Sequence, residues 1–160
     1  ALGRRADDAG ARRRARALAS CGLWRVRLGV EQGLQMLGDK DPEALRSVVE
    51  AWVQDADPLV KRAAVAAICE PRLLRSPESA VVAVSVCAAA TRALPDMPIA
   101  SKKSPGVRAL RQALGYCWSV AVAADPEPGF AAFRALDASD PDVAWIVREN
   151  RKKKRLARLE

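Results

Sequence analysis

Apolar residues recur along most of the chain at the spacing of one face of an α-helix, which is i, i+3, i+4 and i+7. The clearest such stripe contains Leu45, Val48, Val49, Trp52 and Val53. Similar stripes begin at Leu23, Val60, Val107 and Val143. The pattern predicts a series of short amphipathic helices whose buried faces are made mainly of Val, Leu and Ala.

A repeated dipeptide marks where these helices begin. Asp or Ser at the N-cap accepts backbone N–H bonds that the helix leaves unmade, and Pro at the next position sacrifices no bond. The chain has six such pairs: Asp41-Pro42, Asp57-Pro58, Ser76-Pro77, Ser104-Pro105, Asp125-Pro126 and Asp140-Pro141. We interpret Asp41, Asp57, Asp125 and Asp140 as capping residues rather than catalytic acids.

Four segments that open at Gly22, Pro58, Pro105 and Pro141 align with one another. A shorter helix fits before each one, at about residues 7–19, 41–54, 77–94 and 126–136. The sequence therefore predicts eight helices in four hairpins, the third with a longer loop at 95–104. The segment 79–94 is ambiguous, because its β-branched valines also suit a strand; we favour a buried helix there.

The turn before the second of these aligned helices resembles the HEAT-repeat signature. Residues 55–64 read Asp-Ala-Asp-Pro-Leu-Val-Lys-Arg-Ala-Ala, which is similar to the D-x-D-P-x-V-[RK]-x-x-A pattern, and residues 137–143 repeat it with one insertion. The resemblance implies an all-α fold, an α-solenoid of about four HEAT-like hairpins with right-handed stacking, in one domain over residues 1–160. It also implies a concave side lined by the second helices.

The C-terminal segment 143–158 is similar to C-terminal helices in bacterial HEAT proteins of the DNA alkylation-repair group. That resemblance implies an aspartate and tryptophans on a concave face that act on an alkylated base. No acid of this chain matches that aspartate position by position, so a HEAT-like alkylpurine DNA glycosylase is the least favoured of three alternatives.

Charge is concentrated at the two ends of the chain. The net charge is +8 overall, but residues 1–16 carry +4 and residues 148–160 carry +5, which leaves the middle near neutral. Basic ends of this kind either solubilise a helical stack or bind phosphates and acidic partners. We expect the last helix to be solvated, because desolvating its run of cations would be costly. The candidate partner-binding cations are Arg12, Arg13, Arg14, Arg148, Arg151, Lys152, Lys153, Lys154 and Arg155.

The tryptophans are the main aromatic candidates. Trp52 and Trp118 lie within apolar stripes and Trp24 aligns with Val60, so we expect all three in the core. Trp145 lies beside its stripe and near Arg148, so it either packs between repeats or stacks on a base or a peptide aromatic ring. Trp145 is therefore a tenth candidate binding residue.

The sequence offers little chemistry for catalysis. It contains no histidine, which excludes Ser-His and Cys-His pairs, and its four cysteines show no metal-ligand spacing. We expect reduced, buried thiols, no metal, no cofactor and no enzymatic activity. The longest apolar run, Ala80–Thr91, is too short to span a bilayer, so we expect a cytoplasmic protein without a membrane partner. The leading expectation is a scaffold that binds another macromolecule, with a protein partner favoured and a nucleic-acid-binding module as the alternative.

Overall fold

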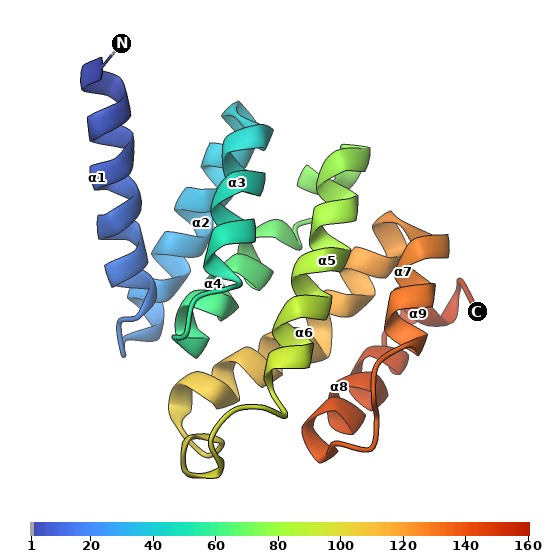
Figure 1. Ribbon diagram of the computed structural model, residues 1–160. Helices are drawn as coiled ribbons and strands as arrows, with labels where there is room; N and C mark the ends of the chain where they lie inside the picture. The colour runs from blue at the N-terminus through green and yellow to red at the C-terminus, as the bar shows by residue number, and fades with distance from the viewer. Residues whose placement is uncertain (1) are drawn as a thin grey trace.

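The computed structural model describes residues 2–160, with side chains from Asp8 onward, and within this range the protein is all-helical (Figure 1). Two short 3₁₀ turns, η1 (Leu73–Arg75) and η2 (Ile99–Ser101), join longer helices. The α-helices are α1 (Leu2–Ala19), α2 (Trp24–Lys40), α3 (Pro42–Trp52), α4 (Pro58–Ile68), α5 (Pro77–Ala93), α6 (Pro105–Ala124), α7 (Pro126–Arg134), α8 (Pro141–Arg151) and α9 (Lys154–Ala157). The all-α prediction is confirmed, including the ambiguous segment, which forms α5.

The Asp-Pro and Ser-Pro pairs begin helices at all six positions, with Pro in the first turn each time. Five of the side chains accept a backbone N–H as expected; for example, Asp57 accepts from Leu59 and Asp140 accepts from Asp142 and Val143. Asp125 is the exception, because its side chain makes no capping bond although α7 begins beside it.

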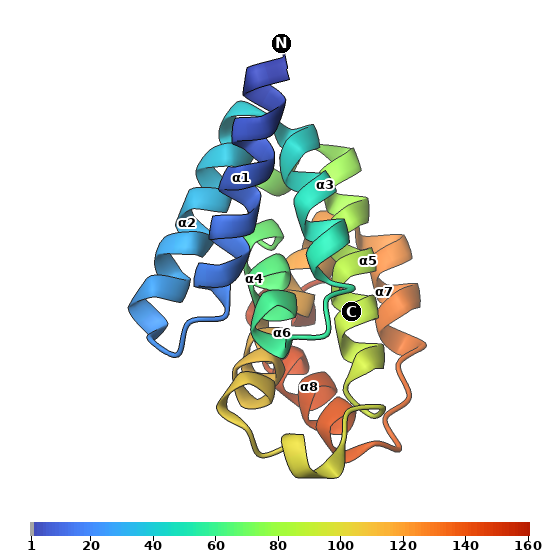
Figure 2. The same ribbon diagram turned by 60° about the vertical axis from the view of Figure 1, so that its left-hand side comes forward.

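The helices from α2 to α8 stand in two layers. In Figures 1 and 2, α3, α5 and α7 stand side by side, and the contacts agree: α3 packs on α5, and α5 packs on α7. A second layer is formed by α2, α4, α6 and α8, each packed on the next. One connected set of buried side chains extends from Ala19 to Leu156.

The first helix departs from this arrangement. It packs on α2 and α4, while α3, α5 and α7 pack on their neighbours within their own layer. Its C-terminal end is held by Arg16, whose guanidinium donates to both carboxylate oxygens of Asp55 at 2.8 Å, and by Ser20, which donates to Asp57. The rest of α1 stands apart from α3 (Figure 1).

The turn that resembles the HEAT signature is held in place by hydrogen bonds of its acidic and basic side chains, one of which pairs with Arg16 of α1. The side chain of Asp55 accepts the backbone N–H of Asp57, and the pKa of Asp55 is lowered, mainly by its hydrogen bond from Arg16. The buried ammonium group of Lys61 donates to the backbone carbonyl of Val53 at 2.8 Å. Burial lowers the pKa of Lys61. These residues join α1, α3 and α4 within the protein.

The C-terminal segment differs from the single helix that we expected, so the described range holds nine α-helices instead of eight. Val143, Ile146 and Asn150 are buried, and continuing their face by three or four residues would bury Lys153 or Lys154 against α6. Burying unpaired ammonium groups is costly. The chain instead becomes extended at Lys153 and starts α9, which packs on α6.

This break buries Leu156, which has no exposed surface. The expectation of a wholly solvated terminal helix is therefore wrong, because an apolar side chain within the basic run anchors it to the core.

Candidate functional site

An open apolar groove lies between α1, α2 and α3, where α1 stands away from its neighbour α3. Its volume is about 480 Å³. Residues of α2 form its floor, from Val26 to Leu37, and Val48 and Trp52 of α3 lie at one side. The remaining lining residues are Ala11, Arg12, Arg14, Ala15, Leu18, Gly29, Val30, Gly33 and Leu34. We call this feature the α1–α3 groove.

The sequence of α1 explains why the groove is not filled. Apart from two arginines, this helix contributes only Ala11, Ala15 and Leu18 to the lining, and Leu18 is 50% exposed. Small side chains cannot span the distance to α3, while the ion pair of Arg16 with Asp55 fixes the end of α1 where it lies. Apolar surface of α2 and α3 therefore remains open.

Two glycines form the centre of the floor. Gly29 and Gly33 are four residues apart on α2, so they lie on the same face of the helix. A Cβ atom built at either position meets no other atom within 4 Å. A glycine pair at this spacing often permits close helix packing, but no described atom lies above these two, and the space over them is open.

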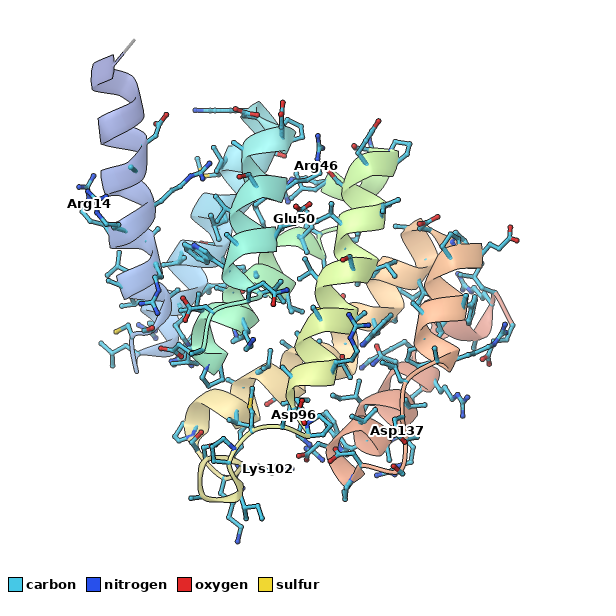
Figure 3. The ribbon with its side chains drawn as sticks, in the orientation of Figure 1. Arg14, Arg46, Glu50, Asp96, Lys102 and Asp137 are labelled. Carbon is cyan, nitrogen blue, oxygen red and sulfur yellow. The ribbon has the colours of Figure 1, made fainter. Side chains whose placement is uncertain are left out.

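The polar groups of the groove all carry positive charge. Arg12 and Arg14 are lining residues, and the lining contains no acidic residue. Figure 3 shows Arg14 projecting from α1 into solvent. Among the described side chains, neither Arg12, Arg13 nor Arg14 forms an ion pair, whereas Arg16 on the same helix does. The structure thus brings Arg12 and Arg14, but not Arg13, to the rim of an apolar surface that the sequence did not reveal.

Trp145 packs against other residues of the same chain. Its ring packs against Gly115 of α6, and the guanidinium carbon of Arg111 lies 3.9 Å from the ring centroid. Arg111 is also held by Asp142, with 3.0 Å between nitrogen and oxygen. Of the two alternatives for Trp145, the structure favours packing between helices, because one face of the ring is already covered.

The C-terminal cations separate into two groups. The first group is exposed and consists of Arg148 on α8, Arg151, Lys152 and Lys154. Within it, Lys152 pairs with Glu149. Lys153 and Arg155 are half-buried and lie over the ring of Tyr116, at 5.6 and 5.4 Å from its centroid. Tyr116 is 45% exposed, and no pattern in the sequence singles it out.

Trp24 contradicts its predicted place in the core. It is 61% exposed, whereas Trp52 and Trp118 are buried as expected. Trp24 is the first residue of α2, and its neighbour Leu23 is 68% exposed. Alignment with Val60 fails because α4 is enclosed by α3, α5 and α6, while the start of α2 lies at the end of the row.

Three cysteines that are distant in sequence come together in the core. The sulfur atoms of Cys69 and Cys87 are 3.6 Å apart, and Cys117 lies beside Cys69. The hydrogen bond with Cys69, together with burial, raises the pKa of the Cys117 thiol well above its usual value. The raised pKa makes the Cys117 thiol a poor nucleophile. Cys21 is free and half-buried.

The protein was compared with known families, with curated proteins and with solved structures, and none of the three comparisons finds a match. Within residues 2–160, no helix combines the length and the apolar character needed to cross a bilayer. Over the same described residues, no group of three or more cysteine or acidic side chains is placed to hold a metal ion.

Proposed function

We propose that this protein is a non-enzymatic, HEAT-like helical scaffold, with right-handed stacking of its hairpins, that binds another protein in the α1–α3 groove. The observation that carries the proposal is the groove itself. Exposed apolar surface costs free energy in water, and large contiguous patches of it mark interaction sites. The consecutive packing of the helices and the Asp57-Pro58 turn support the HEAT-like part.

A pull-down from extracts of the source cells tests this function. The bait pair is the wild-type protein and Gly33→Leu, which fills the groove without meeting another atom near its Cβ. Gln35→Leu is the matched control, because it adds the same side chain to α2 but lies outside the groove. We expect a protein that wild type and Gln35→Leu both retain and Gly33→Leu loses. If no protein shows this dependence, the groove is not a protein-binding site.

A second candidate function is nucleic-acid binding through the C-terminal cations. Its supporting observation is that Leu156 anchors α9, so Lys154 and Arg158 are presented from a docked helix and not from a loose tail. Ordered cations bind phosphates without the full cost of ordering the chain. The salt dependence of binding tests this function.

A further inference from the structure

The shape of the α1–α3 groove favours a helix as its occupant. Helices pack when a ridge of side chains on one fits into a groove on the other, and glycines four residues apart let two helices approach closely. Gly29 and Gly33 supply this spacing on an exposed face, with nothing above either Cα position. Elsewhere in the row the corresponding place is closed, since α3 packs directly on α5 and α5 on α7.

The length of the floor sets the size of the contact. The lining on α2 runs from Val26 to Leu37, which corresponds to about 17 Å at 1.5 Å per residue. About three turns of a partner helix match that length. The lining is apolar apart from its arginines, so the partner helix must present an apolar stripe to it.

The positive charge of the groove favours a partner helix that carries negative charge outside its apolar stripe. Arg12 and Arg14 line the groove, and the lining has no acid to balance them. A second copy of this chain would bring the same arginines together and carries a net charge of +8 itself. Opposite charges across an interface steer association, and like charges oppose it.

From these observations we propose that the α1–α3 groove binds an acidic amphipathic helix of a partner protein. The helix lies on Gly29 and Gly33 with its apolar stripe, and its carboxylates face Arg12 and Arg14. This inference rests on the proposed function and adds the class of partner to it.

The direct test uses a synthetic helical peptide of about five turns, with leucines along one face and glutamates on the others. Its affinity for the full chain is measured by fluorescence anisotropy at low salt. Two peptides serve as controls: one with lysine in place of every glutamate, and one of the same composition with the leucines scattered around the helix. We expect the acidic amphipathic peptide to bind and both control peptides to bind at least roughly tenfold more weakly.

Protein variants locate the binding. Gly29→Leu and Gly33→Leu should each weaken the acidic peptide by roughly tenfold or more, while Gln35→Leu should not. Arg12→Glu with Arg14→Glu should weaken it and reduce its salt dependence. The charge-matched control is Lys154→Glu with Arg158→Glu, two exposed positions on or beside α9, which should have a smaller effect. Circular dichroism confirms that each variant is folded.

Five outcomes overturn the inference. Binding that is equal for the acidic and basic peptides removes the charge argument, and binding that survives both glycine substitutions places it elsewhere. Self-association of the wild type that Gly33→Leu abolishes identifies a second copy as the occupant. Groove-dependent binding of dodecanoate without binding of the peptide identifies a small anionic amphiphile. If the pull-down protein depends on the groove but no acidic peptide binds, the proposed function stands and only the inferred partner class fails.

Discussion

The side-chain oxygen of Asn150 on α8 accepts a hydrogen bond from the backbone N–H of Ser119 on α6, at 2.9 Å. The amide nitrogen of Asn150 donates to the carbonyls of Leu114 and Ile146, at 2.8 and 2.7 Å. Asn150 has no exposed surface. One buried amide therefore joins the backbones of two helices and satisfies polar groups that water does not reach.

Replacing Asn150 by Ala should destabilise the protein by about 2–3 kcal/mol, because buried backbone groups on α6 would lose their partner. Chemical denaturation followed by circular dichroism measures the change. Arg148→Ala, on the same helix and with no buried hydrogen bond, is the control and should change stability by less than about 0.5 kcal/mol. Equal effects of the two substitutions would show that the amide network contributes nothing specific.

The burial of Leu156, which anchors α9, leads to a second prediction about stability. Leu156 is completely buried against α6, so Leu156→Ala should cost about 2–4 kcal/mol through lost burial and a residual cavity. Leu159→Ala removes the same atoms from a side chain that is 44% exposed and should cost much less. If Leu156→Ala were as mild as Leu159→Ala, the C-terminal segment would be a frayed tail, as the sequence first suggested.

The sequence predicts the helices well because their signals are local. Proline after Asp57 or Ser76, followed by apolar residues at helical spacing, depends only on neighbouring residues. The helical state of α5 follows from the same signals, despite its β-branched valines. Features that depend on several helices at once cannot be predicted from such local signals.

Two examples show what local signals cannot supply. Asn150 reads as a polar residue at the end of a helix, and only the position of α6 gives it partners. The α1–α3 groove arises from where Arg16 fixes α1, and nothing in the glycine pair of α2 reveals that the space above it is open. The more common role of such a pair is to permit close packing of two helices.

Two glycine substitutions should have opposite effects. At Gly33 an added methyl group meets nothing within 4 Å, so Gly33→Ala should stabilise the protein by about 0.5–1 kcal/mol through helix propensity. At Gly115 the new Cβ would lie 2.7 Å from the nearest ring carbon of Trp145, which Arg111 covers. Gly115→Ala should therefore destabilise by about 1–3 kcal/mol. Thermal unfolding of both variants tests the contrast, and a gain at both positions would contradict the close packing of Trp145.

The ion pair between Arg16 and Asp55 should make the stability of the protein depend on pH in the acidic range. The hydrogen bond from Arg16 lowers the pKa of Asp55 below its usual value of 3.8 in the folded state. The contribution of this pair is therefore complete above that usual pKa and is lost as the pH falls through the lowered one. Arg16→Gln should reduce the melting temperature near neutral pH, and its difference from wild type should shrink as the pH falls below the usual pKa of 3.8.

Asp8→Asn is a suitable control for that experiment, because Asp8 is exposed and forms no ion pair among the described side chains. A constant difference between Arg16→Gln and wild type at all pH values would assign the effect of Arg16 to packing rather than to the charge of Asp55.

The basic C-terminal segment should give weak, non-specific binding to duplex DNA at low salt. Each phosphate contact that is lost lowers the slope of log affinity against log salt concentration by about 0.9. Replacing Lys152, Lys153 and Lys154 by Ala should therefore reduce the slope by about two to three units. The lower value is expected if Lys153, half-buried over Tyr116, contributes less than its exposed neighbours. Leu156 is retained in this variant, so the fold should persist.

Arg92→Ala, Lys103→Ala and Arg108→Ala together remove the same charge from exposed positions outside the segment and form the control. If both triple variants reduce the slope equally, only net charge drives the binding. If wild type shows no binding at low salt, the basic segment is a solubilising cap and nucleic acid is not a partner.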